Sequence, residues 1–598
     1  FSLSNSGNKS VNQGSSVTNS ITATLSSGTA ASVAFSASGL PTGATAIFLP
    51  TSCNPTCSTT ITISTLSTTP AGTYTITVTG TGGGVTKTTS FTLTVQTATP
   101  SDTISVNANA PRGPMKTYVG FTPSHGYPYY HKRLTSSEQT RLRDANTKFI
   151  RIVPDQCLSS NTVEYLSTAE GVYNWAVLDG NVENAMNAMV SGGEIMVDIF
   201  VPPWLSDPAW RSSATTCSQL IEEHAPPTDY NKWQTYVRDI VNHLNNVKGY
   251  NIKYFQVLNE PNYGDSDVPS LAPNIYGKIY QYAAQGIKAA DPSAKVVGGV
   301  MSNLDSPGWT QSFINFISAN SVPLDVLDWH QYTRSPASIV NEATTARNLL
   351  NGAGYTSAEV MVSEWNWVCF SGCTRTVTAN INAAAGYIAP MIYYLSEAGI
   401  NEAMWYRIVG YWAGNPPATP DIFQLGGSPV WPQYNVFKML GMMAAERVDA
   451  TGLAMNPSGI GRGALASKDA SKVTVLVWNY QDSGGAYANA NLNINNLPAA
   501  FSGRNIRVER YLVDSTHSNV IFNPAKDELE MIENRIISPA GTVILPLTLS
   551  PNAVTLVVLT PVQTPSPFNF SLFNSGSKSV TQGSSVTNSI TATLSSGT

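Results

Sequence analysis

The sequence predicts a multidomain chain built around a (β/α)8 TIM barrel, with one β-sandwich appended to the barrel and another at the N-terminus. Three observations lead to this fold class. The 598 residues are enough for several domains. The pattern changes twice along the chain, from short alternating strands to strands that alternate with helices, and back again. In addition, residues 570–598 repeat residues 1–29 almost letter for letter.

Residues 1–96 read as a separate β-sandwich. The runs 59–64, 73–80 and 89–96 alternate with period two and are bounded by Gly, Pro or Ser, as is typical of antiparallel strands. The first 100 positions contain no Asp or Glu, so this module cannot form the acidic oxygen cage of a calcium-binding domain. It resembles the immunoglobulin-like repeats of secreted bacterial and archaeal proteins.

The end of the chain begins a second copy of this module. Residues 570–598 form a partial immunoglobulin-like repeat, which differs from residues 1–29 only at Ser4/Phe573, Asn8/Ser577 and Asn12/Thr581. Pro/Thr-containing linkers, 97–103 and 562–569, separate the two copies from the rest of the chain. We expect the second copy to belong to a longer tandem array or to be completed by a neighbouring molecule, and we favour the array.

Residues 104–449 are predicted to form the barrel. Helical patterns at 231–247, 274–290 and 376–398 lie between short apolar runs, which is typical of βα units. An open doubly wound sheet is the alternative, but no Gly-rich phosphate fingerprint follows any of the strands. The eight expected strands are 117–121, 149–153, 195–201, 254–259, 295–301, 326–331, 359–365 and 402–408.

Residues 450–561 return to a β pattern and are predicted to form a sandwich packed on the barrel. The expected strands include 472–480, 504–513, 541–549 and 553–561. We expect residues 104–110, just before the barrel, to contribute a further strand to this sandwich.

Composition excludes several classes of protein. Charged residues are 12% of the chain and the net charge is −5, so no nucleic-acid partner is indicated. No apolar run approaches the roughly 20 residues of a membrane span. The six cysteines include two close pairs, Cys53/Cys57 and Cys369/Cys373, which favour disulfides and secretion over a metal site. A bridge between Cys369 and Cys373 is expected to stiffen the loop after strand 359–365.

Two glutamates end predicted barrel strands. Glu260 follows strand 254–259, and Glu364 lies at the end of strand 359–365. The carboxyl ends of the strands carry the chemistry of a TIM barrel, and these two strands lie across the mouth from each other. Two carboxylates facing one cleft are the minimum for glycoside hydrolysis, one as acid and one as nucleophile or base. Asn259, beside Glu260, can hydrogen-bond a sugar hydroxyl.

The strand-end motifs resemble those of a known group of enzymes. LNEPN at 258–262 and SEWN at 363–366 resemble the clan A glycoside hydrolases, most closely family 39, with families 5, 30 and 51 still open. The resemblance implies a retaining mechanism, with Glu260 as acid/base and Glu364 as nucleophile. It also assigns substrate-site roles to Arg151, His330, Tyr332 and Trp405.

Several of these residues also have a purely structural interpretation. Trp204 and Trp365 join Trp405 as expected sugar-binding aromatic residues, although tryptophan is often buried in protein cores. His330 can be a hydrogen-bonded core histidine, and Arg151 can simply pair with Asp155 or Asp198. We expect Asp198, inside an apolar strand, to be a buried structural carboxylate rather than a third catalyst.

Together these patterns predict a secreted retaining glycoside hydrolase that cleaves a poly- or oligosaccharide and needs no cofactor or metal. The immunoglobulin-like repeats are expected to anchor the enzyme at a cell surface or on polysaccharide. The alternative is a non-catalytic surface-layer or adhesion protein that only binds carbohydrate. The repeats favour that alternative, whereas the pair of glutamates disfavours it.

Overall fold

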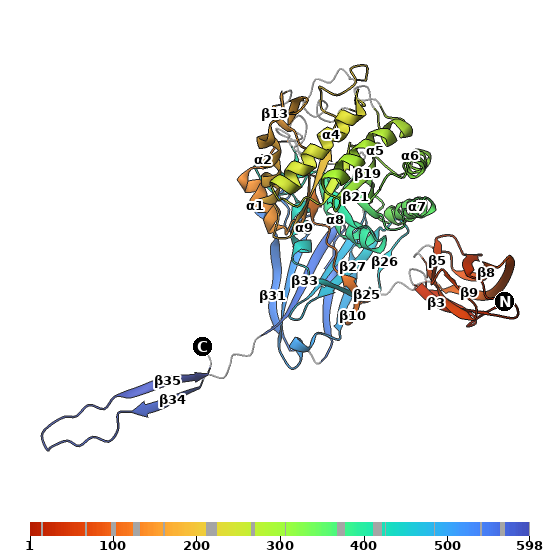
Figure 1. The fold of residues 1–598 in the computed structure, drawn as a ribbon. Coiled ribbons are helices and arrows are strands. Elements are labelled where there is room, and N and C mark those ends of the chain that lie inside the picture. The colour runs from red at the N-terminus through yellow and green to blue at the C-terminus, as the bar shows by residue number, and fades with distance from the viewer. Residues whose placement is uncertain are drawn as a thin grey trace.

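The fold is seen in a computed structural model (Figure 1). It describes residues 1–12, 16–65, 69–96, 103–122, 132–159, 162–210, 224–264, 270–304, 307–367, 377–410, 421–424, 426–482, 485–538, 541–562 and 569–596.

Eight parallel strands form a closed barrel in the centre of the chain, and each overlaps one of the eight strands that the sequence predicts. Neighbours in sequence are neighbours in the barrel, and the last strand pairs with the first. The strands are β11 (Gly120–Phe121), β12 (Phe149–Ile152), β17 (Glu194–Ile199), β18 (Tyr254–Val257), β19 (Lys295–Met301), β20 (Val326–Tyr332), β21 (Glu359–Asn366) and β22 (Glu402–Trp405).

Helices connect the strands on the outside of the barrel (Figure 1). Local signals fix where several begin: Asp229 caps α4 through its side chain, and Pro273 is the first residue of α5. The helices are α1 (Ser136–Asp144), α2 (Trp175–Met186), α4 (Tyr230–Val241) with the π-helical turn η1 (Asn242–Val247), α5 (Pro273–Ala290), α6 (Pro307–Ala319), α7 (Ser338–Gly352), α8 (Val377–Glu397) and α9 (Pro432–Gly441).

The barrel interior changes character along its axis. Near the amino ends of the strands it is filled by one apolar cluster: Phe149, Met196, Tyr254, Val297, Val326, Met361 and Met404. Side chains two residues further along a strand point the same way. On four of these strands that next position is polar and buried, with Arg151, Asp198, Gln256 and Asp328 all at most 5% exposed. A polar layer therefore separates the apolar plug from the mouth of the barrel.

The appended β domain is one continuous sheet path rather than two separate sheets. It curls around a core that includes Val106, Val475, Leu492 and Leu545. Its members are β10 (Thr103–Pro114), β25 (Glu446–Thr451), β26 (Ala454–Met455), β27 (Gly461–Lys468), β28 (Val473–Tyr480), β29 (Ala488–Asn495), β30 (Ile506–Val513), β31 (Glu530–Ile537), β32 (Val543–Leu549) and β33 (Ala553–Pro561).

The chain enters this domain before the barrel and returns to it afterwards. β10 pairs in parallel with β29 and antiparallel with β25, so residues ahead of the barrel do supply a strand. Because β25 already begins at Glu446, the domain starts a few residues before the expected boundary at 450. The sheet packs on the barrel through α8 and α9. Trp478 and Tyr480, both fully buried, join the barrel core there.

Residues 2–96 form two sheets that share one core. A four-stranded sheet (β1, β3, β7, β5) faces a five-stranded sheet (β2, β9, β8, β4, β6), and Ile21, Ile61, Ile76 and Leu93 are fully buried between them. The strands are β1 (Ser2–Asn5), β2 (Lys9–Asn12), β3 (Ser16–Thr24), β4 (Val33–Ser38), β5 (Ala44–Leu49), β6 (Ser52–Cys53), β7 (Cys57–Thr65), β8 (Gly72–Gly82) and β9 (Val85–Gln96).

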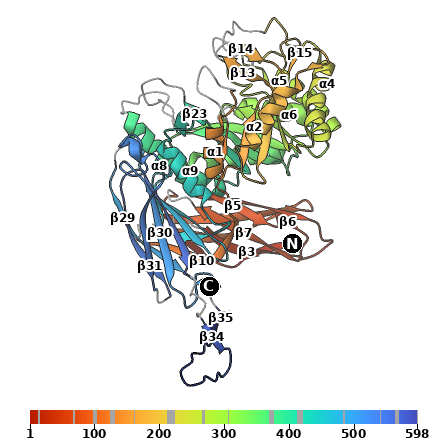
Figure 2. The same cartoon turned by 90° about the vertical axis from the view of Figure 1, so that its left-hand side faces the viewer.

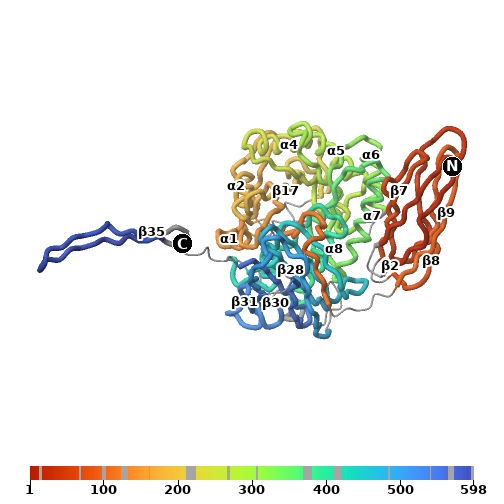
Figure 3. The backbone as a smooth tube through the Cα atoms, turned by 90° about the horizontal axis from the view of Figure 1, so that it is seen from below, coloured from red at the N-terminus to blue at the C-terminus, as the bar shows by residue number. Residues whose placement is uncertain are grey.

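The C-terminal repeat forms a hairpin of β34 (Asn569–Asn574) and β35 (Ile590–Ser596). Its register equals that of β1 and β3 in the first copy: Leu572 pairs with Ala592 as Leu3 pairs with Ala23. Ile590 is 70% exposed, whereas Ile21 at the same repeat position is fully buried. Figures 1 and 3 show the hairpin and the N-terminal module on opposite sides of the barrel.

Shorter elements complete the fold. They are β13 (Gln156–Ser159), β14 (Thr162–Glu164), β15 (Ser167–Ala169), β16 (Val172–Tyr173), β23 (Val409–Gly410), β24 (Phe423–Gln424), η2 (Ala499–Phe501) and η3 (Pro524–Lys526). Figure 2 shows the appended sheet and the N-terminal module on the side of the barrel away from β13 to β15.

The sequence predicts disulfides and no membrane-spanning segment, and the structure bears on both expectations. Cys53 and Cys57 are disulfide-bonded, and so is Cys157. Cys217, Cys369 and Cys373 lie outside the described residues, so the expected stiffening of the loop after β21 stays a prediction. Within the described ranges, no helix is both long and apolar enough to cross a membrane.

Candidate active site

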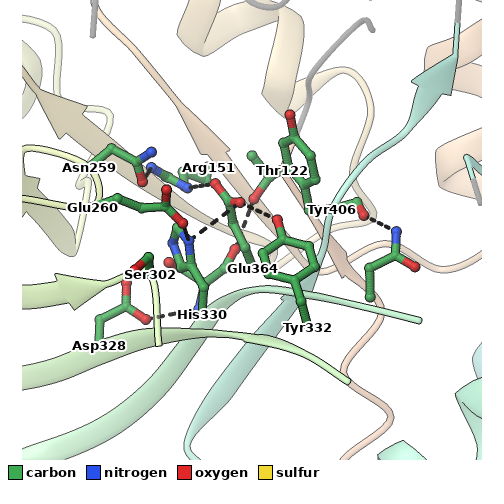
Figure 4. Close-up of polar contacts among 12 residues, drawn as sticks. Thr122, Arg151, Asn259, Glu260, Ser302, Asp328, His330, Tyr332, Glu364 and Tyr406 are labelled. Carbon is green, nitrogen blue, oxygen red and sulfur yellow. Dashed lines mark hydrogen bonds and ion pairs between the residues drawn. The ribbon is translucent and has the colours of Figure 1, made fainter. Parts of the chain in front are cut away.

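Glu364 lies near the end of β21 with a donor on each carboxylate oxygen (Figure 4). Arg151 donates to Oε1 at 2.6 Å, and the Tyr332 hydroxyl donates to Oε2 at 2.5 Å. Burial raises the pKa of Tyr332 well above its usual value, and Glu364 raises it further, so Tyr332 stays a neutral donor. The side chain of Glu364 is 9% exposed, and its orientation is fixed from both sides.

Glu260 follows β18 and approaches the same space from the other side of the mouth. His330 Nδ1 lies 2.6 Å from Glu260 Oε1 and 3.5 Å from Glu364 Oε2. Burial lowers the pKa of His330, but Glu364 and Glu260 raise it more, so the net pKa lies above its usual value. His330 therefore acts as a donor to Glu260, whose side chain is 22% exposed and more open than that of Glu364.

The two glutamates share one small space. One ligand atom each from Glu260, His330 and Glu364 lie within 4.8 Å of one another. A separation of about 5–5.5 Å between two carboxyl groups allows direct attack by one of them, whereas about 6.5–9.5 Å leaves room for an intervening water. The observed spacing therefore fits direct attack by one of the carboxyl groups.

Arg151 on β12 connects the residues around the pair. Its guanidinium donates to Asp198 Oδ2 at 2.7 Å and to Asn259 Oδ1 at 2.6 Å, besides Glu364. Burial lowers the pKa of Arg151, but Asp198 and Glu364 raise it above its usual value, so it remains charged. Asp198 is thus the buried structural carboxylate that the sequence indicates. Since Asn259 Oδ1 accepts from Arg151, its NH2 group is directed elsewhere.

The backbone at the end of β18 has an unusual conformation. Leu258 and Glu260 have φ angles of 59° and 45°, in the left-handed region that non-glycine residues rarely adopt. Two buried side chains hold this segment: Gln256 Nε2 donates to Leu258 O at 3.0 Å, and His224 Nε2 lies 2.5 Å from Asn259 O. Such strained backbone is retained where the surroundings enforce it, commonly at functional sites.

Comparisons with known proteins agree with this geometry. Residues 104–354 match the family model described as glycosyl hydrolases family 39. This part of the chain, which holds six of the eight barrel strands, is similar to glycosyl hydrolase family 39.

Two curated β-xylosidases are similar in sequence to parts of this chain. The protein from Geobacillus stearothermophilus is 27% identical over 201 residues, which cover 29% of this chain and 37% of the relative. The protein from Caldicellulosiruptor saccharolyticus is 34% identical over 142 residues, covering 23% and 28%. The matched segments thus span well under half of each relative.

A solved structure supports the fold over a longer stretch. The monomeric β-xylosidase from Caulobacter crescentus superposes with a TM-score of 0.62 at 15% identity, covering 77% of this chain and all of that one. At this identity the likeness concerns the fold alone.

The structure brings together six of the nine expected site residues: Arg151, Asn259, Glu260, His330, Tyr332 and Glu364. Trp204 lies beyond β17, where its indole donates to Ser167 Oγ at 3.0 Å and its ring packs against the barrel core. No contact with the glutamate pair is seen for Trp204 among the described residues.

Trp365 and Trp405 do not line the site, contrary to expectation. Both are fully buried and pack edge to face at a centroid distance of 4.9 Å, with Phe437 of α9 beside them. They point away from the barrel axis because neighbouring residues on a strand face opposite sides. Tyr406, one residue after Trp405, lies next to the site instead, with its ring 6.2 Å from that of Tyr332.

Sequence reasoning also missed His224, Thr122 and Asp328, all of which lie at or beneath the site (Figure 4 labels the last two). Asp328 and His330 are two residues apart on one strand, and this spacing indicates that both side chains face the same side of it. His224 comes from a loop and left no comparable signal.

A metal ion could in principle be held by Glu260, His330 and Glu364. Two charges oppose it, since Arg151 already lies 2.6 Å from Glu364 and the raised pKa of His330 favours its protonated form. The arrangement is better suited to acid–base and nucleophilic chemistry by the two carboxyl groups.

Proposed function

We propose that this chain is a secreted retaining glycoside hydrolase that cleaves a poly- or oligosaccharide through a covalent glycosyl-enzyme. The observation that carries the proposal is the pair of carboxyl groups within 4.8 Å of each other, held by different partners. Arg151 and Tyr332 stabilise a charged Glu364, which suits a nucleophile. Among the described residues, the partner of the Glu260 side chain is His330 at one oxygen, which leaves the other oxygen for proton transfer.

In the first step, a Glu364 oxygen attacks the anomeric carbon of the bound sugar. The bond between that carbon and the leaving oxygen breaks, and Glu260 gives its proton to the leaving oxygen. The products are a glycosyl ester on Glu364 and a released alcohol or shortened saccharide. Glu364 loses its charge when the ester forms. Arg151 and Tyr332 are then hydrogen-bond donors beside the ester.

In the second step, water attacks the same anomeric carbon from the side that the leaving group vacated. Glu260, now ionised, takes the proton of that water, and the bond to Glu364 breaks. Two inversions give net retention of configuration. Asn259 can donate its NH2 group to a sugar hydroxyl, and Tyr406 offers an aromatic face beside the reacting ring.

The sugar is proposed from the relatives. Both curated relatives are named β-xylosidases, so a β-linked xyloside is the substrate that we propose first. The test is to incubate the purified chain with nitrophenyl β-xyloside and with a panel of other nitrophenyl glycosides and polysaccharides. Release of nitrophenol that Glu364→Gln abolishes supports the proposal. Binding of saccharides with no turnover of any substrate contradicts it and favours a non-catalytic carbohydrate-binding protein.

We further propose that residues 1–96 form an immunoglobulin-like module that anchors or spaces the enzyme outside the cell. The lack of Asp and Glu in the first 100 positions means that this module supplies no catalytic carboxylate. Deletion of residues 1–100 and 563–598 is therefore expected to leave turnover of a small soluble glycoside within about threefold of the full chain, as separately folded modules allow. A folded but inactive core in the same assay would contradict this division of labour.

A further inference from the structure

β21 contains an extra residue beside its catalytic end. From Asp328 to His330 on β20, the paired residues on β21 run from Met361 to Glu364. From Ala403 to Trp405 on β22, they run from Val362 to Trp365. In both cases β21 uses three steps where its neighbour uses two. This is a β-bulge at Ser363 and Glu364, seen from both adjacent strands.

The bulge decides which way Glu364 points. Met361 belongs to the apolar cluster inside the barrel. Regular alternation from Met361 would place Ser363 and Trp365 inside and Glu364 outside. Instead Glu364 reaches Arg151 in the barrel, while Trp365 packs against Phe437 outside it. The same sequence paired without the bulge would thus turn Ser363 and Trp365 into the barrel and Glu364 out of it.

The backbone of Ser363 is held by side chains of two other strands. Its N–H donates to Asp328 Oδ1 at 2.9 Å, and its carbonyl accepts the Thr122 hydroxyl at 2.9 Å. Asp328 belongs to β20, and Thr122 directly follows β11. Both side chains are buried, at 0% and 8% exposure. Figure 4 shows them on different sides of Glu364.

We propose that Asp328 and Thr122 are positioning residues, which hold the bulge at Ser363 and thereby turn Glu364 into the mouth of the barrel. The inference rests on the proposed function, in which Glu364 is the nucleophile. A buried backbone group without a partner costs about 1–3 kcal/mol. The bulge leaves the N–H and carbonyl of Ser363 dependent on these side chains, so losing either favours a different local register.

The need for an acceptor separates this role from an electrostatic one. Burial raises the pKa of Asp328 to about 6, although His330 and the Ser363 hydrogen bond oppose the rise. Asp328→Asn keeps an oxygen that can accept the Ser363 N–H and removes the charge. Asp328→Ala removes both. Thr122→Ser keeps the hydroxyl donor, and Thr122→Val removes it at nearly constant volume.

The experiment measures kcat and KM of these four variants on aryl glycosides with good and poor leaving groups. A misplacement of the nucleophile by about 1 Å costs roughly 100-fold. We therefore expect kcat of Asp328→Ala to fall by about that factor for both leaving groups, with KM little changed. Thr122→Val should fall less, and Asp328→Asn and Thr122→Ser should stay within about threefold of wild type because their hydrogen bonds remain.

Asp325→Ala is the matched control. Asp325 lies just before β20 and accepts the Val296 N–H at 2.8 Å, so its carboxylate makes the same kind of bond at the other end of the barrel. We expect its kcat to equal that of wild type.

Three kinetic results would overturn the inference. One is a folded Asp328→Ala with wild-type kcat, and another is Asp328→Asn as impaired as Asp328→Ala. If Asp328→Ala does not fold, equal kcat for Thr122→Val and Thr122→Ser is the third. If the wild type itself turns over no glycoside, the proposed function fails instead. A crystal structure of Thr122→Val then tests the bulge alone: displacement of Ser363 and Glu364 supports the inference, and an unchanged bulge overturns it.

Discussion

The two ends of the barrel both carry carboxylates beside cations, but the surroundings of these carboxylates differ. At the mouth, both oxygens of Glu364 are bound by donors, and Arg151 links it to Asp198. At the other end, Glu402 begins β22 among lysines and two further glutamates, and its burial raises its pKa to about 7, against the opposing effect of Lys116. At the mouth, hydrogen bonds fix the position of the Glu364 carboxylate. At the base, the environment of Glu402 makes ionisation of its carboxyl group unfavourable.

The largest effect is expected at the mouth, from Glu364→Ala. Without the nucleophile, turnover should fall by about 10⁴-fold or more, as for other residues that act as part of a catalytic unit. Added azide can then attack the anomeric carbon directly, and the product should have inverted configuration. NMR of the azide product checks this, and a product of retained configuration would mean that the two glutamates have exchanged roles.

Glu260→Ala should have a smaller effect that depends on the leaving group. General acid catalysis contributes about 10²–10⁴-fold, and this loss applies only where the leaving oxygen needs a proton. Dinitrophenyl glycosides should therefore still form the glycosyl-enzyme, and azide should intercept it with net retention. Measuring kcat/KM against leaving-group pKa is the check. Equal losses for good and poor leaving groups would remove Glu260 from the acid role.

Glu402→Gln should change stability at the base and leave the mouth unaffected. The folded pKa of about 7 lies above the ordinary 4.5, so the contribution of Glu402 to folding is present below about pH 4.5 and is lost as the pH rises to 7. The shift corresponds to on the order of 3 kcal/mol at most. Glutamine avoids this loss, so Tm should exceed that of wild type by several degrees at pH 8 and equal it at pH 4.

The control for this comparison is Glu170→Gln, since the side chain of Glu170 is 61% exposed. It should shift Tm at neither pH. The kcat of Glu402→Gln should match wild type, and a Tm difference that does not change with pH would show that the Glu402 carboxyl does not titrate as described.

Much of the barrel could be predicted because its signals are local. Each strand is a short apolar run between helical patterns, and the polar residues that end the strands identify the mouth. Glu260, Glu364 and Arg151 were found in this way, since a strand end specifies position along the barrel axis. The repeat adds a second example, because residues 570–596 form the same hairpin register as residues 2–24 in a different environment.

The features that the sequence did not reveal are side-chain directions. Trp365 and Trp405 were assigned to the site from their position at strand ends, but they face the helices. The bulge at Ser363 reverses the alternation on β21, and it is visible only in the pairing with both neighbours. Strand ends fix an axial level and not a face, so the sequence did not separate Tyr406, which lies beside the site, from Trp405, which does not.

Direct attack of Glu364 on the sugar can be tested by the anomeric configuration of the first product. Hydrolysis of a nitrophenyl β-glycoside is followed by ¹H NMR before the released sugar mutarotates. We expect the β-anomer as the initial product, because two displacements restore the original configuration. An α-anomer appearing first would indicate a single displacement by water and would contradict the covalent mechanism.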